Sequence, residues 1–395
     1  MKIKLLAICL LICIIFNPAV FAQDAETELE NQTAIEVDDD KPDKYGESDR
    51  VKYAKGRFKN EGFNIPLDAP TSLDGYQALY TANMLNSATL RDRTDDKVYN
   101  RGLQIPEGAQ ITIYHVEPNW VLTEYKGDIG WIKRIMLNEG TIQTIDPKNT
   151  APYGVQDMKY IATITEDTYV LNRPDPNATP FKIPVDAGAK IALFGFENGY
   201  AKVNIWRNYG YIDAKILKDV QMIAPSAEQP LTPDMPLAAY CSFFDHSLGK
   251  ESNDSRVINI AVSCKYMTMT LQSGESFDFN AQVGPYKRTK GYQPAPVLIN
   301  GGSQLGYGGG TCQSSSTLYN VLKQMPGITI LWRRPHGPGS AKYLPQHMDA
   351  AVGNQLLNLK FRNDYDFPVR FEAQSVKGCL FIAAYKVQDD VKAEK

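Results

Sequence analysis

Residues 308–320 read GGGTCQSSSTLYN, and this stretch decides how the C-terminal part of the chain folds. The three glycines permit a tight turn. Apolar residues then recur at helical spacing, and a Pro-Gly pair stops the pattern: Leu318, Val321, Leu322 and Met325, then Pro326 and Gly327. We predict a helix that begins near Cys312, with Thr311 or Ser314 as its cap.

The predicted helix places Cys312 in its first turn. A helix N-terminus carries partial positive charge and unpaired backbone amides, which favour a thiolate. Amides of the 308–312 turn would be free to form an oxyanion hole. The turn residues in this hypothesis are Gly309, Gly310 and Thr311, together with Gln313 as a further donor or as polar packing. Cys312 is therefore a candidate nucleophile.

A cysteine nucleophile also needs a base. His336 follows the strand-like sequence ITILWRRP and opens a loop rich in glycine and proline, where catalytic groups often lie. Asp349 comes 13 residues later. Cys312, His336 and Asp349 satisfy the logic of a nucleophile, a base and an orienting carboxylate. Composition alone makes this triad weak, because most chains of this size offer the same three residue types.

Several ordered segments between residues 237 and 390 together resemble the VanW family. They read GESFDFN, VGPYKRTKGYQPAPVLINGG, GYGGGTCQSSSTLYN, RRPHGPGSAKYLP, MDAAV and LNLKFRNDYDFPVRFEA. The segment RVINIAVSCKYM, with Arg256 and Asn259, resembles the opening helix of the family. VanW domains occur in glycopeptide-resistance clusters and in wall-associated proteins. The resemblance implies an α+β domain over residues 237–390.

Some VanW members are regarded as L,D-transpeptidases that use the cysteine of this motif. The resemblance therefore implies Cys312 as nucleophile, His336 as base and Asp349 as the acidic partner. The chain departs from the family pattern at Ser314, at Gly337 and at 346–348, so His347 is a second candidate base. Candidates to hold substrate carboxylates are Arg288, Lys290, Arg333 and Arg334, with Tyr343 as a further substrate contact. A solvated surface is the alternative for the four cations.

The N-terminal part of the chain has the composition of an exported protein. Residues 1–22 have two lysines, a short apolar run and small residues before Gln23, which is typical of a secretory signal peptide. An uncleaved anchor is the alternative. Residues 23–50 are acidic and poor in aromatic residues, so we predict a solvated tether. Residues 51–96 are mixed, with a short helix expected in GYQALYTANMLNSATLRDR.

Two further segments share one layout, a Pro-Gly approach followed by paired strands and an aromatic residue after glycine. They lie at 97–145 and 160–222 and resemble bacterial SH3-like domains, which often bind wall peptides. We therefore expect two small all-β barrels, a Pro-rich linker at 223–236 and the VanW-like domain. Trp120, Trp131 and Trp206 suit a barrel core at least as well as a ligand surface.

Charge and cysteine usage exclude some functions. The net charge of −3 gives no support for a nucleic-acid partner. No Cys/His pairs have metal-ligand spacing, so we expect neither a metal nor a cofactor. After signal removal four cysteines remain, and a disulfide at Cys312 is an open alternative in an oxidising compartment. We expect Cys241, Cys264 and Cys379 to be buried.

The predicted function is thus peptidoglycan L,D-transpeptidation by an exported monomer in the periplasm, cell envelope or extracellular space, with stem peptides as partners and no stable membrane span after signal cleavage. Two other classes stay open. One is a wall-binding scaffold without catalysis, and the other is a cysteine peptidase or carboxypeptidase acting on stem peptides.

Overall fold

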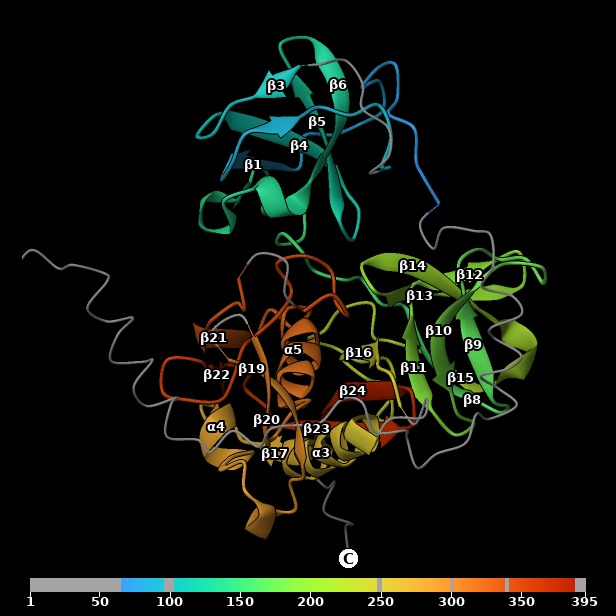
Figure 1. Cartoon of the computed structure of the whole chain (residues 1–395), viewed down its shortest axis with the longest axis vertical. Coiled ribbons are helices and arrows are strands. Elements are labelled where there is room, and N and C mark those ends of the chain that lie inside the picture. The colour runs from blue at the N-terminus through green and yellow to red at the C-terminus, as the bar shows by residue number, and fades with distance from the viewer. Residues whose placement is uncertain (1–64, 96–102, 247–250, 300–301, 338–340, 388–395) are drawn as a thin grey trace, which may run out of the picture.

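The computed structural model describes residues 65–95, 103–246, 251–299, 302–337 and 341–387. The expected signal peptide and acidic tether lie outside these residues. The described chain is mostly β and forms three units, which occupy separate parts of the view in Figure 1. In the described part of the chain, no helix has the length and apolarity needed to cross a membrane.

The first unit is built on a five-stranded antiparallel sheet in the order β6-β5-β4-β1-β7. The strands are β1 (Tyr80–Asn83), β4 (Gln110–Val116), β5 (Trp120–Tyr125), β6 (Asp128–Lys133) and β7 (Gln143–Thr144). β2 (Ala88–Thr89) pairs with β3 (Gln104–Ile105), and the 3-10 turns η1 (Arg134–Met136) and η2 (Glu139–Thr141) follow β6. Alternating apolar residues of β4 enter a core that contains Ile111, Ile113 and Val121.

Two sequence expectations for this unit are corrected. The short helix expected within 75–93 is wrong, because these residues contain β1 and β2 instead. The apolar residues Tyr80 and Ala82 alternate with Thr81 and Asn83, and β1 pairs along β4. The sheet therefore begins upstream of residue 97, where we had placed the first barrel.

The second unit contains two antiparallel sheets, in the orders β10-β9-β14-β13-β12 and β11-β8-β15. Its strands are β8 (Tyr160–Ile164), β9 (Thr168–Leu171), β10 (Pro180–Val185), β11 (Lys190–Leu193), β12 (Gly195–Glu197), β13 (Tyr200–Ile205), β14 (Asn208–Asp213) and β15 (Leu217–Met222), with η3 (Ala214–Ile216) between the last two. The sheets of the described residues are open, so the antiparallel β class is confirmed while closed SH3-like barrels stay a prediction.

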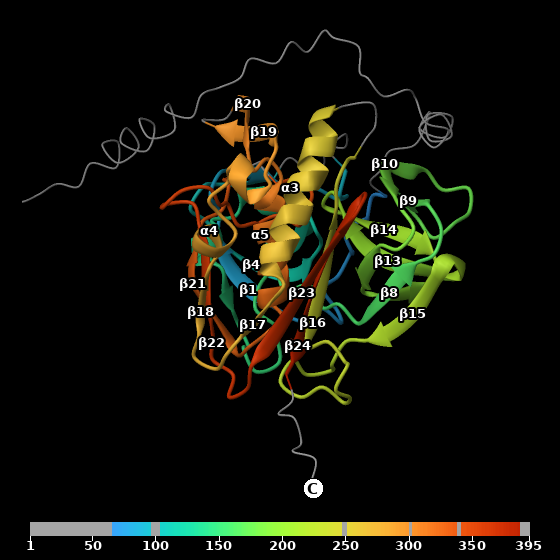
Figure 2. The same cartoon turned by 90° about the horizontal axis from the view of Figure 1, so that it is seen from below.

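The third unit is α+β, as expected. A four-stranded sheet runs in the order β16-β24-β23-β17, and Figure 2 shows α3 lying across it. Its elements are β16 (Ala238–Phe243), α3 (Glu251–Met267), β17 (Met269–Leu271), β18 (Ser276–Asp278), α4 (Phe279–Gln282), η4 (Arg288–Lys290), β19 (Pro294–Ile299), β20 (Gly302–Tyr307), α5 (Thr311–Leu322), β21 (Ile328–Arg333), β22 (Leu359–Asn363), β23 (Val369–Val376) and β24 (Cys379–Lys386).

The second and third units share one hydrophobic core. Buried residues from β8 to β24 form a single cluster, whereas the first unit has a core of its own. The contact is close, since the amide of Ala192 on β11 lies 3.3 Å from Cys241 Sγ on β16. The Pro-rich segment 223–236 also contributes the buried residues Ile223 and Met235. The two units are therefore packed together rather than separated by a loose linker.

Candidate functional site

Helix α5 begins at the glycine turn predicted from the sequence. Gly310 is the N-cap and adopts a left-handed conformation with φ 109°, which favours glycine. Thr311 is the first helical residue and Cys312 the second. The expected side-chain cap from Thr311 or Ser314 is wrong, because the glycine cap makes no side-chain hydrogen bond. Cys312 therefore lies at the positive end of the helix.

Asn259 of α3 holds this turn in place. Its amide Nδ2 donates to the carbonyl oxygens of Gly309 and Gln293, both at 2.9 Å, and its Oδ1 accepts from the Gln293 amide at 2.7 Å. Asn259 is fully buried. In the described part of the chain, the backbone amides of Gly309, Gly310 and Cys312 have no hydrogen-bond acceptor. These donors are available to an oxygen beside the thiol.

Of the two roles considered for Gln313, the structure shows polar packing. Its side chain is buried, and Nε2 donates to Ser242 Oγ at 2.9 Å and to the Phe243 carbonyl at 3.2 Å. Its Oε1 accepts from the Arg256 guanidinium at 2.6 Å. All of these partners are internal, so polar packing describes the Gln313 side chain and an oxyanion donor does not.

The hydroxyl-rich face of α5 binds the loop that carries Asp349. Ser315 Oγ donates to the Ala350 carbonyl at 2.6 Å, and Ser316 Oγ accepts from the Ala350 amide at 2.9 Å. One turn later, Asn320 Nδ2 donates to the Met348 carbonyl at 2.7 Å. Sequence reasoning missed this role, although polar residues four positions apart on one helix face, at 316 and 320, were a usable signal.

His336 and Asp349 form a largely buried pair. Asp349 Oδ2 accepts from the backbone amide of His336 and lies 2.7 Å from its Nδ1. Burial would raise the pKa of Asp349, but hydrogen bonds from His336 and the charge of Arg333 hold it below the ordinary value. Burial would lower the pKa of His336, but Asp349 and the side chain of Cys312 raise it to about 10. His336 is therefore an imidazolium at neutral pH.

Cys312 differs from the other described cysteines in its exposure to solvent. It is partly exposed, whereas Cys241, Cys264 and Cys379 are buried, and all four are free of disulfides. Burial raises the pKa of Cys264 to about 12 and raises that of Cys379 as well. The open alternative of a bridged Cys312 therefore does not describe this structure. Cys312 is therefore the accessible thiol, and it lies at a helix start beside the His336 side chain.

Two tyrosines lie near enough to Cys312 for its charge to affect their pKa values. Burial raises the pKa of both Tyr286 and Tyr343 well above the ordinary value, and the neighbouring charge of Cys312 raises it further. Tyr286 Oη donates to Asn280 Oδ1 at 2.7 Å, and the same oxygen accepts from the Gly353 amide at 3.2 Å. Tyr343, considered for substrate contact, thus lies beside Cys312, and Tyr286 is a neighbour that sequence reasoning missed.

Arg333 contacts protein groups rather than an open surface. Its Nε donates to the Asp349 carbonyl at 2.7 Å and Nη2 to the His347 carbonyl at 2.9 Å. Its Nη1 pairs with Glu139 of the first unit. These bonds use the guanidinium fork, so the expectation that Arg333 holds a substrate carboxylate is corrected. Arg288 and Arg334 are exposed, and the Arg334 guanidinium lies 5.6 Å from the Trp332 ring centre.

His347, the second candidate base, contacts Tyr153 rather than the Cys312 thiol. Its Nδ1 is 3.5 Å from Tyr153 Oη of the segment that follows the first unit. Burial, and then the charges of Arg134 and Arg333, lower its pKa to about 3. His347 is therefore neutral at physiological pH, because burial and the nearby cations outweigh the charge of Asp349. Of the two candidate bases, the geometry favours His336.

Replacing Gly309 with alanine is expected to lower the unfolding free energy by about 1–3 kcal/mol. A Cβ at this position would come within 2.6 Å of the Pro296 carbonyl oxygen and 2.7 Å of Ala295 Cβ, so the backbone must shift. Gly140→Ala is the matched control, because its Cβ would meet nothing closer than 3.6 Å. Urea unfolding measures the unfolding free energy of both variants. If both lose the same free energy, the close approach of Gly309 to Pro296 and Ala295 does not affect stability.

Arg333→Lys is expected to slow alkylation of Cys312 by about 10-fold, which corresponds to about 1.4 kcal/mol. Lysine keeps the charge but loses the fork that joins Asp349, His347 and Glu139, so the His336–Asp349 pair shifts. The adjacent exposed Arg334→Lys is the control and should react at the wild-type rate. Peptide-resolved mass spectrometry follows Cys312 at several pH values. A purely structural role would leave the pH profile unchanged.

The comparison with protein-family models concerns the third unit. Residues 255–385 match the family model described as VanW like protein. These residues form a VanW-like domain. The match includes Cys312, His336 and Asp349. It also includes two α3 residues, Asn259, which holds the glycine turn, and Arg256, which binds the Gln313 side chain.

One curated relative of this chain is the uncharacterized protein YoaR of Bacillus subtilis (strain 168). It is 33% identical over 181 residues, which is 45% of this chain and 57% of YoaR. The chain thus spans less than two thirds of that relative. Among solved structures, NlpC1 and NlpC2 of Trichomonas vaginalis match over 82% and 79% of this chain and 97% and 99% of their own chains, at 12% and 9% identity. Their TM-scores of 0.15 and 0.14 assign no shared fold.

Proposed function

We propose that this chain is an exported peptidoglycan-modifying protein whose VanW-like domain is a cysteine L,D-transpeptidase. It would form 3–3 cross-links between peptide stems. The observation that carries the proposal is the placement of Cys312 at the start of α5 beside the His336–Asp349 pair. That arrangement supplies a nucleophile, a proton carrier and a carboxylate that orients it.

The first half-reaction forms a thioester. The sulfur of the Cys312 thiolate attacks the carbonyl carbon of the third stem residue, and the amides of Gly309, Gly310 and Cys312 receive the negative oxygen, whereas the Thr311 amide is bonded to the Gly308 carbonyl. The C–N bond to the terminal D-Ala then breaks. The leaving nitrogen takes a proton from the His336 imidazolium, while Asp349 holds the ring through Nδ1. D-Ala departs with the proton, and the stem stays on the sulfur.

The second half-reaction releases the stem. A side-chain amine of a neighbouring stem attacks the thioester, a C–N bond forms and the C–S bond breaks. The neutral imidazole accepts the proton of the amine, which restores the imidazolium and the thiolate. Water as the acceptor would give carboxypeptidase activity through the same intermediate. The exposed cations Arg288 and Arg334 and the neighbouring Tyr343 are proposed substrate contacts.

The first two units are proposed as SH3-like wall-binding units. The antiparallel sheets and the repeated Gly-aromatic pairs within strands β6 and β14, Gly130–Trp131 and Gly210–Tyr211, support this proposal. They would keep the VanW-like domain close to its polymeric substrate in the cell envelope, by raising the local concentration of stems. The proposal includes cleavage of residues 1–22 and a monomeric chain.

The test is incubation of the purified chain with muropeptides that carry tetrapeptide stems, followed by mass spectrometry. We expect free D-Ala, a stem attached to Cys312 in quenched samples, and dimers with 3–3 links. Monomers that lose D-Ala without dimers would assign a carboxypeptidase instead. Absence of both the adduct and the products would reject the enzymatic proposal and favour a wall-binding scaffold.

A further inference from the structure

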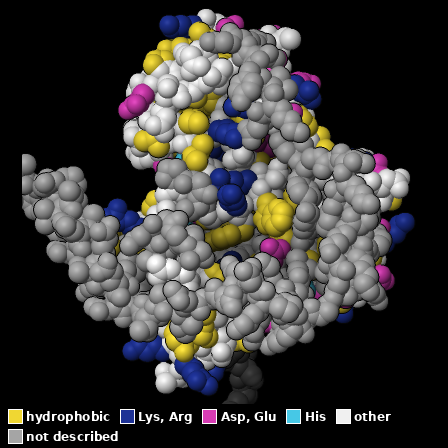
Figure 3. Space-filling view, in the orientation of Figure 1, with side chains coloured by type: hydrophobic (Ala, Val, Ile, Leu, Met, Phe, Trp, Pro, Cys, Tyr) yellow, Lys and Arg dark blue, Asp and Glu magenta, His cyan; other side chains and the backbone are white. Residues whose placement is uncertain are grey.

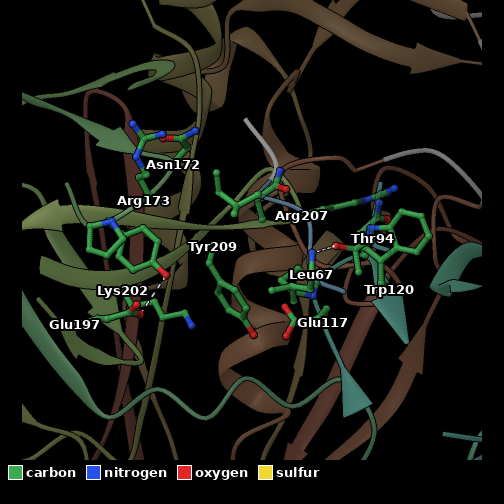
Figure 4. A pocket seen from close by; sticks show the side chains of 16 residues that line it. Leu67, Thr94, Glu117, Trp120, Asn172, Arg173, Glu197, Lys202, Arg207 and Tyr209 are labelled. Carbon is green, nitrogen blue, oxygen red and sulfur yellow. Dashed lines mark hydrogen bonds between the residues drawn. The ribbon is translucent and has the colours of Figure 1, made fainter. Parts of the chain in front are cut away.

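A pocket of about 370 Å³ opens between the first and second units, and none of Cys312, His336 and Asp349 lines it. Its volume is within the range of small-molecule sites. Figure 4 shows Lys202 and Glu197 on one side, Trp120 and Thr94 on the other, and Tyr209 between them. In Figure 3, basic side chains lie along the junction of the upper unit with the rest of the molecule.

The walls of this pocket are fixed by contacts outside it. The turn 117–120 forms one wall, and its Pro118 carbonyl accepts from the Gln346 amide at 3.0 Å. The buried Arg134 side chain donates to the Glu117 carbonyl at 3.2 Å. Since the third unit and the first unit's core both hold this turn, the pocket does not require a ligand to form.

The opposite wall carries backbone strain. The hairpin between β13 and β14 turns through Trp206 and Arg207, with φ values of 48° and 60°. Glycine or asparagine usually occupies such positions, and bulky residues there cost about 1 kcal/mol or more each. Trp206 packs edge-on against Phe181 in the core at 6.1 Å, and the next residue, Arg207, lines the pocket. Backbone strain of this kind persists where the surrounding structure holds a residue in place for a function, and here that residue is Arg207 in the pocket wall.

The pocket lining has unequal charge. Its carboxylates already have protein partners: Glu117 Oε1 lies 2.8 Å from His115 Nε2, and Glu197 Oε2 accepts from Tyr211 Oη at 3.2 Å. The Lys202 ammonium rests on the Tyr209 ring, 4.0 Å from its centre, and makes no ion pair with any residue that the structure describes. The Lys202 ammonium, which lies beside aromatic and apolar surface, is thus available to bind a ligand.

We propose that the pocket between the first two units binds the carboxylate end of a short peptide, with Lys202 contacting the carboxylate. The apolar body of the peptide packs against Tyr209 and Leu67. The asparagine side chains of the lining, Asn119, Asn172 and Asn208, offer hydrogen bonds to peptide groups. This site is independent of the proposed chemistry at Cys312, so either proposal can fail without the other.

The test measures binding to the full chain by calorimetry, with Trp120 fluorescence as a second readout. The probes are N-acetyl-trialanine with a free carboxylate and the same peptide as its C-terminal amide. We expect the acid to bind at least about 10-fold more tightly than the amide, which is about 1.4 kcal/mol. Lys202→Gln should weaken acid binding about 10-fold, while Lys218→Gln, exposed on β15 and outside the pocket, should not.

The chain's own acidic residues are a second source of the same chemistry, because 23–50 precedes the pocket residue Ile65 in the sequence. The variant Asp38→Asn, Asp39→Asn, Asp40→Asn separates the two sources. If the acid peptide binds this variant but not the wild-type chain, the acidic residues of 23–50 occupy the pocket in the wild-type chain. That result would still support a carboxylate site. Three results would overturn the proposal. The acid and amide peptides bind with equal affinity, Lys202→Gln and Lys218→Gln bind the acid with equal affinity, or none of these chains binds the acid.

Discussion

Cys312→Ala is expected to abolish thioester formation and release of D-Ala, with a loss of at least about 10³-fold in rate. No other described cysteine can replace it, because Cys241, Cys264 and Cys379 are buried. Mass spectrometry of the intact chain after incubation with tetrapeptide stems should show the adduct in wild type alone. Quantifying D-Ala and 3–3 dimers in the same samples gives the rate.

The matched control is Cys264→Ala, which removes a buried thiol far from the glycine turn in sequence. It should keep the adduct, although its stability falls modestly because a small cavity forms. Cys312 is only partly buried, so its alanine variant should unfold at nearly the wild-type urea concentration. A Cys312→Ala chain that still produces dimers would place the nucleophile elsewhere.

Asp349→Asn is expected to slow acyl transfer by about 10²- to 10⁴-fold. The amide keeps the shape of the side chain but removes the charge that orients His336 Nδ1 and stabilises the imidazolium. The pKa of His336 should therefore fall from about 10 towards its ordinary value. Asp364→Asn is the control, because this carboxylate pairs with Arg362 at the surface. Stopped-flow measurement of D-Ala release compares the variants.

The same variant changes how stability depends on pH. The folded-state pKa of His336, about 10, lies above the unfolded value of 6.5, so its contribution to stability is fully present below pH 6.5. That contribution declines as the pH rises and is lost once the pH passes about 10. Asp349→Asn shortens this window. Urea unfolding at pH 6 and at pH 9 should therefore show that the free energy of unfolding falls more between these two pH values in wild type than in Asp349→Asn. An equal loss in both chains would contradict the pairing of His336 with Asp349.

Local sequence determined the helix and the turn that carry the thiol. Three glycines, an apolar stripe and a Pro-Gly stop predicted α5, and the structure has it at Thr311–Leu322. These signals act within a few residues, because backbone conformation and helix stops depend on near neighbours. Local residues also named Cys312, His336 and Asp349 as candidates, and the VanW resemblance then gave the α+β class of the third unit and strengthened the choice of these three residues.

Only the tertiary structure decided which groups each polar side chain meets. Arg333 contacts Glu139 of the first unit, Gln313 is buried against Ser242, and His347 lies beside Arg134. Residues 80–83 belong to the stretch 75–93 in which we expected a short helix, but they form a strand because β4 pairs with them. These partners lie far away in the sequence, and a carboxylate, an amide or an edge strand takes its role from whichever distant group the folded chain places beside it.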